Sequence, residues 1–460
     1  MNLESIDYIF ILLFFGIIYL TSYFAGKKQS GKTDDYLLSG RNVGLFLFVL
    51  TNVSTWYGGI LGVGEFTYSY GIASWFTQGF PYYIFAAVFA FLMAGKIRKA
   101  QLYTIPEKLT QTYGEKTGKL ASLLILLLVS PAPYLLMAAN IIALIIDVHI
   151  FYAILFISFI SFIYLYKGGF KADLYTDAIE FFFMFAGFIA IVVFAYFNLG
   201  GLEYLENNLP ETHLDPTGGT SPAFMLVWFL IALWTFADPG FHQRCYSAKN
   251  AKVAKYGILI SIFFWALFDF LTTSTGLFAR AAIPSIETPV NAYPLLAEKL
   301  LPAGVKGLFY IALFSTIFST LNSFLFLSSV TIGKDLLKSV KKSDVKKTKM
   351  GLLITVVTAG IISLYFDSVI AIWYTIGSIC IPPLILLVFG SYFPKLETLP
   401  KFAIAEVIAG VSAGTLWFII KDQFTNEILL TIEPMLVGLF ISGAIHFTGI
   451  ILKRKQITNK

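Results

Sequence analysis

Apolar stretches of about 20 residues recur from one end of this 460-residue chain to the other. A bilayer with a hydrocarbon core of about 30 Å is crossed by a helix of roughly that length. Hydrophobic residues make up 57% of the chain and charged residues only 13%, which is too little charge for the surface of a water-soluble protein. The sequence therefore predicts an all-α polytopic membrane protein, with residues 1–460 forming a single transmembrane domain.

Thirteen such runs, each bounded by polar or turn-forming residues, predict thirteen transmembrane helices. Their expected positions are residues 7–26, 45–66, 74–95, 118–146, 149–166, 173–199, 221–239, 253–281, 303–332, 349–365, 367–392, 402–420 and 430–452. The first run follows Glu4 and Asp7 rather than a basic segment, so we expect a spanning helix and not a signal peptide. The few residues after the last run leave no room for a soluble output domain.

Basic residues lie on alternate loops between the apolar runs. Typical groups are Lys96, Arg98 and Lys99; Arg244, Lys249, Lys252 and Lys255; and the cluster from Lys334 to Lys349. Because cytoplasmic loops are enriched in lysine and arginine, this alternation predicts an N-terminus outside and a C-terminus in the cytoplasm of a bacterial inner membrane. The net charge of +6 is thus explained by topology and does not indicate nucleic-acid binding.

Two of the runs are too polar and too rich in helix-breaking residues for ordinary lipid-facing helices. The second run contains the segment from Thr51 to Gly59 and then Glu65. The seventh contains Trp234 to Gly240, in which Pro239 lacks a backbone donor and follows an acid. Both runs are predicted to form discontinuous helices, because irregular backbone at membrane depth is tolerated only where it is enclosed by protein or lines a cavity.

The two predicted breaks are five helices apart, and a shift of five helices reverses the orientation in the membrane. This spacing is typical of two inverted repeats, here residues 45–199 and 221–392, with 7–26 as a leading helix and 402–452 as trailing helices. Broken helices offer carbonyls to cations and amides to polar solutes, which indicates a secondary transporter. The alternative is that the glycines only allow close helix packing.

Six short segments carry a further signal in their order and spacing. They are Tyr36–Gly44, Thr55–Gly59, Lys167–Phe170, Thr176–Glu180, Gln243-Arg244 and Ser319–Ser323. Each is weak alone, but together they make the chain resemble, along nearly its whole length, the sodium/solute symporter family, which includes bacterial proline, pantothenate, sialic acid and sugar transporters. The resemblance implies a five-plus-five inverted-repeat fold with one helix before it and two after, and solute uptake driven by a sodium gradient.

The resemblance also implies a sodium site between the first break and the ninth helix. Its ligands would be the backbone carbonyls of Ser54, Tyr57 and Thr316 with the hydroxyls of Ser319 and Thr320. Without the family spacing, these two hydroxyls would be expected to bond carbonyls of their own helix. Asp177 corresponds to a family acid near the inward exit of the ion. The sequence departs from the family at Glu180, where glutamine is usual, and at Leu165, where a small or hydroxyl residue is typical.

Acids inside a membrane cost about 2.5–3.5 kcal/mol at a helix centre, so each one indicates a function. Glu65 and Asp269 fall in the outer halves of their predicted helices, with Arg280 further out, which predicts either an outer-gate ion network or a structural pair. Asp238 lies beside the second break. It is a candidate for binding a cationic group, a second cation or a proton.

Aromatic and polar residues near the breaks are the candidates for a solute cavity, because aromatic walls with a few polar groups suit a small polar ligand. They are Trp56, Tyr57, Gln78, Trp234, Asp238 and Tyr374. The expected solute belongs to the sugar, amino acid or carboxylate class, and the motifs do not distinguish among these.

Four histidines without a paired catalytic constellation give no support for an enzyme. Gly26–Thr33 fits the P-loop pattern, but it follows an apolar helix and not a β-strand, so the match is attributed to chance. We therefore predict a sodium-coupled symporter without a cofactor, whose partners are sodium, a small solute and membrane lipids. Two rivals are a proton-coupled carrier, using Asp238 or Asp269, and a solute-sensing receptor of the same fold.

Overall fold

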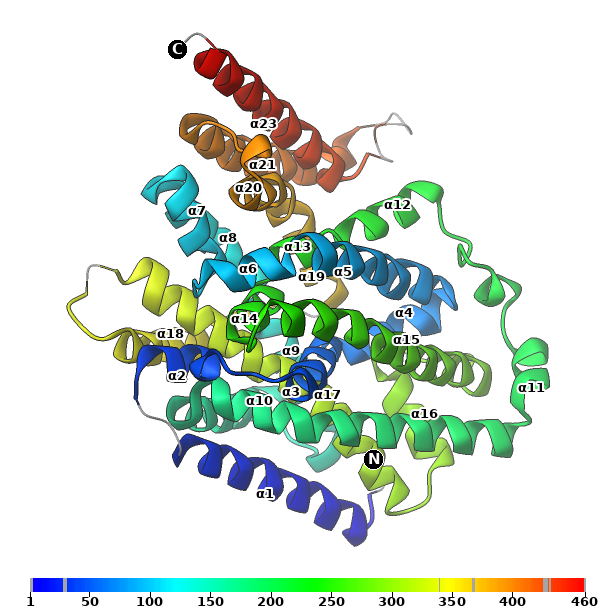
Figure 1. The fold of residues 1–460 in the computed structure, drawn as a ribbon. Coiled ribbons are helices and arrows are strands. Elements are labelled where there is room, and N and C mark those ends of the chain that lie inside the picture. Colours follow the sequence, from blue (N-terminus) through cyan, green and yellow to red (C-terminus); the bar gives the residue numbers. More distant parts are fainter. Residues whose placement is uncertain are drawn as a thin grey trace.

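The computed structural model describes residues 3–27, 31–338, 340–365, 369–424, 429 and 432–458. Within these residues the chain is helical, and the sole β-interaction is an isolated bridge between Val43 and Ala248. Residues 28–30 of the P-loop match and the first residues of the predicted spans 367–392 and 430–452 lie outside the described residues. The helices cross one another in a single assembly, in which α17 runs through the middle (Figure 1).

The first half of the chain contains one leading helix, a group of bent and short helices, and one very long helix. These elements are α1 (Ser5–Lys27), α2 (Thr33–Leu38), η1 (Ser39–Arg41), α3 (Leu45–Ser54), η2 (Thr55–Tyr57), α4 (Ile60–Tyr70), η3 (Trp75–Gly79), α5 (Phe80–Leu92), α6 (Ala94–Ala100), α7 (Ile105–Tyr113), α8 (Glu115–Leu128), α9 (Ala132–Ile146), α10 (Ile150–Leu199), α11 (Gly201–Asn208) and η4 (Glu211–Leu214).

The second half begins with three consecutive short helices and ends with two long ones that pack on each other. Its elements are α12 (Pro222–Ile231), α13 (Trp234–Ala237), α14 (Pro239–Ser247), α15 (Ala251–Ala282), η5 (Pro289–Asn291), α16 (Ala292–Leu300), α17 (Val305–Val330), η6 (Thr331–Leu336), α18 (Asp344–Ser363), α19 (Val369–Cys380), α20 (Pro382–Tyr392), η7 (Pro394–Leu396), α21 (Pro400–Ile420), η8 (Lys421–Gln423) and α23 (Pro434–Thr458).

Nine helical segments of the described chain are long and apolar enough to cross a membrane, and two bent helix pairs raise the number to eleven. The chain is therefore a multi-pass integral membrane protein. Eleven is fewer than the thirteen predicted spans for two reasons. The predicted spans 149–166 and 173–199 form the single helix α10, and α18, which covers the predicted span 349–365, is not among the eleven.

Both predicted interruptions of helical structure are present. The helix pair Leu45–Tyr57 and Ile60–Tyr70 bends by 56°, and α12, α13 and α14 replace what would otherwise be one helix. A third break, which the sequence analysis did not predict, separates α19 from α20 and bends that pair by 51°. Pro382 and Pro383 at the start of α20 account for it, because proline removes backbone donors and ends the preceding helix.

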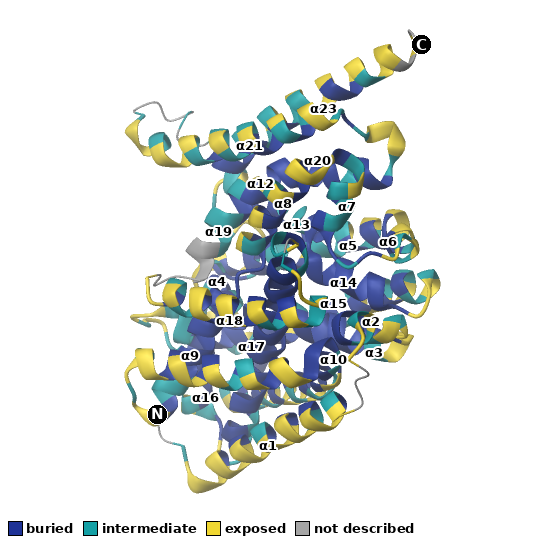
Figure 2. Cartoon of the chain, turned by 90° about the vertical axis from the view of Figure 1, so that its left-hand side faces the viewer, coloured by how far each residue is buried: buried dark blue, intermediate teal, exposed yellow. Residues whose placement is uncertain are grey.

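Burial separates a central helix from a lipid-facing periphery. The most apolar window of the span that contains α17 is 100% buried, whereas in α1 and α21 the corresponding share is 28%. Figure 2 shows α1, α21 and α23 with exposed residues along their outer sides and buried residues around α17. Since hydrocarbon chains are as apolar as leucine, exposed apolar faces on the outer helices are expected, and polar groups gather in the interior.

Gly169 divides α10 into two segments, one on each side of the interruption. Its backbone lies at φ 54° and ψ −159°, a conformation that essentially only glycine adopts. A Cβ atom at this position would lie 2.7 Å from a ring carbon of Tyr36 and 2.8 Å from the Tyr36 carbonyl oxygen. The sequence Lys167–Phe170 therefore provides the turn that lets the second half of α10 pack against the centre of the molecule.

We expect Gly169→Ala to lower the stability of the folded protein by about 1–3 kcal/mol, because alanine strains this backbone conformation. Thermal unfolding in detergent, followed by differential scanning fluorimetry, measures the change. Gly16→Ala is the matched control, since Gly16 lies in α1 and a Cβ there would meet nothing within 4 Å. Equal unfolding temperatures for the two variants would contradict the assigned role of Gly169.

Candidate functional site

A buried polar cluster lies where four elements meet: the break η2, the second half of α10, the short helix α14 and the central helix α17. Its members are Thr55, Asp177, Arg244 and Ser319, one from each element, and all are at most 8% exposed. Polar groups at such depth are stable only when they bond one another or bind a ligand. The cluster is therefore the first candidate for a functional site.

Asp177 accepts hydrogen bonds from all three of the other elements. Ser319 Oγ donates to Asp177 Oδ1 at 2.6 Å, and Thr55 Oγ1 donates to Oδ2 at 3.1 Å. Arg244 Nη2 forms an ion pair with the same Oδ2 at 3.3 Å. The Thr55 and Ser319 hydroxyls lie 3.3 Å apart, and Ser319 Oγ also lies 3.2 Å from Ser54 Oγ. Asp177 thus lies among the predicted sodium ligands themselves.

The five residues predicted to bind sodium lie on two adjoining elements. Ser54 ends α3, Tyr57 ends η2, and the other three, Thr316, Ser319 and Thr320, follow one face of α17. Thr320 Oγ1 donates to the Thr55 carbonyl at 2.6 Å, which links α17 directly to the break. A Cβ atom on Gly58 would lie 2.1 Å from Thr320 Cβ, so only glycine permits this close approach.

Two of these residues use their hydroxyls elsewhere. Thr316 Oγ1 donates to the Leu313 carbonyl of its own helix at 2.8 Å, and Tyr57 Oη donates to the Trp265 carbonyl at 2.8 Å. This is compatible with the roles that the family resemblance implies, since both residues were expected to contribute backbone carbonyls. The hydroxyl groups available to an ion are those of Ser319 and Thr320, with Thr55 as a further candidate.

Three carboxylates of α10 face this region, at positions 173, 177 and 180. Asp173 Oδ2 accepts from Ser323 Oγ at 2.6 Å, while its other oxygen has no hydrogen-bond partner in the described part of the chain. The same holds for both carboxylate oxygens of Glu180: no described residue bonds them, although Glu180 is fully buried. Arg244 is the cation that interacts with the other two acids. The position where the family usually has glutamine therefore adds a third buried acid.

No group of three or more His, Cys, Asp or Glu side chains in the described residues is arranged to hold a metal ion. A cation at the cluster would therefore be bound by hydroxyls, carbonyls and the single carboxylate of Asp177. Such a set of hard, mainly neutral oxygens suits a small hard cation and lacks the nitrogen and sulfur ligands of transition metals.

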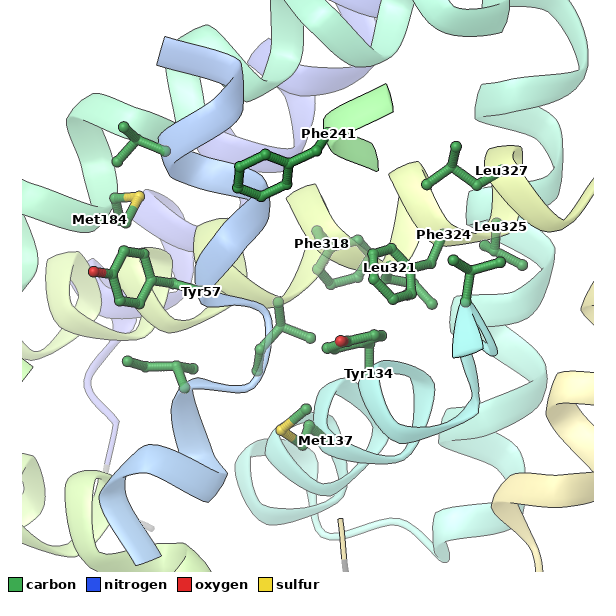
Figure 3. Packing of buried hydrophobic residues seen from close by; sticks show 14 of the residues in the cluster. Tyr57, Tyr134, Met137, Met184, Phe241, Phe318, Leu321, Phe324, Leu325 and Leu327 are labelled. Carbon is green, nitrogen blue, oxygen red and sulfur yellow. The ribbon is translucent and has the colours of Figure 1, made fainter. Parts of the chain in front are cut away.

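A cavity of about 140 Å³ opens beside the cluster and separates the two predicted broken regions. Five of the six predicted solute residues line it: Trp56, Tyr57, Gln78, Trp234 and Asp238. Asp269, Thr320 and Arg244 also line it, so the cavity adjoins the candidate ion site. Tyr134 of α9 and Phe324 of α17 both line this cavity, and their ring centres are 5.0 Å apart. Figure 3 shows the two rings side by side.

The sixth predicted solute residue, Tyr374, does not line the cavity, and its hydroxyl donates to Glu433. Its neighbour Trp373 lines the cavity instead. Gln78 lies in the π-helical turn η3 and lines the cavity, and its buried amide nitrogen has no hydrogen-bond partner among the described residues.

The structure does not join the three predicted gate residues. Asp269 accepts a hydrogen bond from Tyr83. Arg280 Nη1 donates to the Tyr68 hydroxyl at 3.2 Å and to the Pro284 carbonyl at 2.5 Å. Within the described residues no ion pair links Arg280 to either Asp269 or Glu65, because Arg280 points to the end of its own helix. Asp269 lines the solute cavity.

Arg244 corrects one expectation from the charge pattern. The charge pattern places it among the basic residues of a cytoplasmic loop, but it lies in α14 with 2% exposure and forms an ion pair with Asp177. Sequence charge alone does not distinguish a loop arginine from one in a short helix after a break. The Gln243-Arg244 motif was the one signal in the sequence that marked Arg244 as a site residue, but the motif by itself indicates no role.

A multi-pass helical protein with a polar cluster and a cavity at interrupted helices has the arrangement of a secondary transporter. A family model described as "Sodium:solute symporter family" matches residues 36–398, and the chain belongs to this family. The sodium/pantothenate symporter of Haemophilus influenzae is 29% identical over 288 residues, covering 60% of this chain and 54% of that protein. The high-affinity choline transporter 1 of Drosophila melanogaster is 32% identical over 210 residues, covering 43% and 33%.

The chain thus spans about half of the first relative's length and a third of the second's. Among solved structures, a substrate-bound outward-open Na⁺-coupled sialic acid symporter has a TM-score of 0.82 at 17% identity, covering 98% of both chains. This likeness extends over the whole fold.

We expect Arg244→Gln to destabilise the protein by roughly 3–5 kcal/mol, since it leaves buried carboxylates without their cation. Adding Asp177→Asn should restore part of the loss, because the second change removes one uncompensated charge. Thermal unfolding of the two single variants and the double variant measures this coupling. Asp34→Asn is a control, because its ion pair with Arg41 is 51% exposed on the Asp34 side and such pairs contribute about 0–1 kcal/mol. Strictly additive effects of Arg244→Gln and Asp177→Asn would refute the coupling.

Proposed function

We propose that this protein is a sodium-coupled symporter that imports a small polar organic solute by alternating access. The main support is the cluster of oxygen groups at the break around Thr55. Ser319 donates to Asp177 at 2.6 Å, Thr320 donates to the Thr55 carbonyl at 2.6 Å, and the Thr55 hydroxyl donates to Asp177 at 3.1 Å. These are hard oxygen groups, enclosed by protein, at a site where an interrupted helix exposes its backbone. Membership in a family described by sodium and solute symport supports the same conclusion.

The charge balance of the buried region favours a bound cation. Asp173, Asp177 and Glu180 carry three negative charges when ionised, and Arg244 compensates one of them. Isolated buried charges are so costly that groups of this kind are neutralised by protons or by ions. Sodium at the Ser54, Tyr57, Thr316, Ser319 and Thr320 site would supply part of the missing positive charge.

Sodium binding at this position would connect η2 with α17, two elements that belong to different halves of the chain. An ion that binds one conformation more tightly than another shifts the equilibrium toward it by that difference in affinity. We infer that sodium stabilises the outward-open state and that solute in the adjoining cavity then permits closure. The shared lining residue Thr320 gives the two ligands a direct point of contact.

Our topology for this mechanism has thirteen helices, with repeats at 45–199 and 221–392, a leading helix at 7–26 and trailing helices at 402–452. Gly169 divides the 50 residues of α10 into two helical segments, and each has about the 20 residues that one crossing needs. α18 has the 20 residues that a further crossing needs. The alternation of basic loops favours an outside N-terminus and a cytoplasmic C-terminus in a bacterial inner membrane.

Two alternatives keep the same fold. A proton-coupled carrier is favoured by one observation: Glu180 is fully buried, and neither of its carboxylate oxygens has a partner among the residues that the structure describes. A solute-sensing receptor would use the same sites without net transport. The solute itself is not fixed by family membership, because the names of the relatives include pantothenate, choline and sialic acid, which differ in charge. Sugars, amino acids and carboxylates remain the classes that the sequence motifs favour.

We expect sodium chloride to raise the unfolding temperature of the purified protein more than potassium chloride at equal ionic strength, because a ligand of the folded state stabilises it. Ser319→Ala should raise the sodium concentration for the half-maximal shift by about 10- to 100-fold, since bonds to charged groups contribute about 1.5–3 kcal/mol. Ser329→Ala is the matched control, because this α17 hydroxyl donates to the Phe326 carbonyl of its own helix at 2.6 Å. An unchanged sodium response in Ser319→Ala would contradict the site.

We expect solute uptake into proteoliposomes to follow an inward sodium gradient and to continue when an ionophore abolishes the pH gradient. Glu180→Gln, which restores the usual family residue, should retain sodium-driven uptake because it leaves Ser319 and Asp177 in place. Radiolabelled solute uptake measures both effects. Uptake that follows a pH gradient without sodium and disappears in Glu180→Gln would establish the proton-coupled alternative instead.

A further inference from the structure

The cavity beside the buried polar cluster has an unusual charge balance for a site that accepts a sugar or a carboxylate. Two carboxylates, Asp238 and Asp269, and one cation, Arg244, are the charged residues among those that line it. Arg244 Nη2 is bonded to Thr55 and to Asp177, while its buried Nε atom has no hydrogen-bond partner among the described residues. The cavity therefore presents two acids to a solute, and its one guanidinium already forms an ion pair with a third acid, Asp177.

The helix end that could bind an anionic group is also occupied. The N-terminus of α14 faces the second break, and helix N-termini attract anions through their free amides and the helix dipole. Asp238 itself caps this helix, because its Oδ1 accepts from the Phe241 amide at 2.8 Å. A solute carboxylate would find this position filled by a carboxylate of the protein.

The same hydrogen bonds hold Asp238 in a fixed orientation toward an aromatic wall. Its Oδ2 accepts from Trp234 Nε1 at 3.0 Å, and each oxygen keeps a further lone pair for another donor. Tyr82 and Tyr134 line the same cavity as this carboxylate. Trp56 packs edge to face on Tyr82, with ring centres 4.9 Å apart, and it lines the cavity as well.

A carboxylate surrounded by electron-rich rings is the arrangement that recognises organic ammonium groups. Cations bind the faces of tryptophan and tyrosine rings with about 0.5–2 kcal/mol, and desolvation strengthens this attraction. Two acids offer a neutral sugar only hydrogen bonds to its hydroxyls, whereas they attract a cation and repel an anion. We propose that the solute of this transporter is a compact organic cation, bound through its ammonium group by Asp238 and the aromatic rings around it.

The size of the cavity agrees with a compact solute, because a cavity of about this volume holds a molecule of roughly benzene size. Asp269 lies on the lining as a second carboxylate and is oriented by Tyr83. The inference rests on the proposed symport function, since it names the class of solute for the same site. The test must therefore report sodium binding and solute binding separately.

The probe is choline, compared with its uncharged isostere 3,3-dimethylbutan-1-ol, with pantothenate and with glucose. Purified protein in sodium chloride is titrated with each compound while tryptophan fluorescence is recorded, because Trp56 and Trp234 line the cavity. We expect a saturable change with choline and none with the isostere, pantothenate or glucose. Asp238→Asn should weaken choline binding by at least about tenfold. Asparagine caps helices as well as aspartate does, so this variant should fold normally.

The sodium-dependent rise in unfolding temperature is measured on the same samples, and it should persist in Asp238→Asn. Asp269→Asn is the second variant, and we expect weaker choline binding there too. A saturable response to glucose or pantothenate without one to choline would overturn the inference and leave the symporter proposal intact. Choline binding that neither variant affects would overturn the role of the carboxylates. Loss of the sodium effect in the unmodified protein would instead overturn the proposed function.

Discussion

The ion pair between Arg244 and Asp177 is the interaction on which the arrangement of the central helices depends. Arg244 Nη2 bonds the Thr51 carbonyl at 3.4 Å, the Thr55 hydroxyl at 2.5 Å and the Asp177 carboxylate at 3.3 Å. It thereby connects the end of α3, the break η2 and α10 from a position on α14. Buried ion pairs contribute little net stability compared with well-packed apolar residues, so the value of this pair lies in fixing one geometry. Removing one partner would leave a buried charge without its counter-charge.

Side chains of the second broken region supply the charges that the helix ends at both breaks favour. α3 ends at the first break, where free carbonyls favour a cation, and Arg244 of α14 provides it. α14 begins at the second break, where free amides favour an anion, and Asp238 provides it. Asp238 is the N-cap of α14 and Arg244 lies within it, and every residue from Asp238 to Ser247 is buried. A movement of α14 would displace the cap at the solute cavity and the cation at the ion cluster together, which gives a structural basis for coupling the two sites.

Much of this architecture could be predicted from the sequence, because lipid imposes strong rules on composition. Apolar run length predicted the helices, and polar or glycine-rich segments predicted the breaks at Thr51–Gly59 and Trp234–Gly240. The break before Pro382 was missed, since its surroundings are apolar and only the two prolines mark it. The environment of Arg244 was missed for a different reason. Its partner Asp177 is 67 residues away, and no local pattern shows that a basic residue after a break turns inward.

The leading helix shows how the periphery contributes to the central site. α1 exposes most of its surface, yet Asp7 is fully buried and its Oδ1 accepts from the amides of Gly304 and Gly307 at 2.7 Å each. These amides belong to the start of α17, so a carboxylate from α1 caps the helix that carries Ser319 and Thr320. α17 is therefore held at its N-terminal end by α1 and near its middle by the cluster around Asp177. An ion would rearrange the side-chain bonds around Asp177 but would leave the Asp7 cap unchanged. α17 therefore has one fixed end, about which its ion-binding part can adjust.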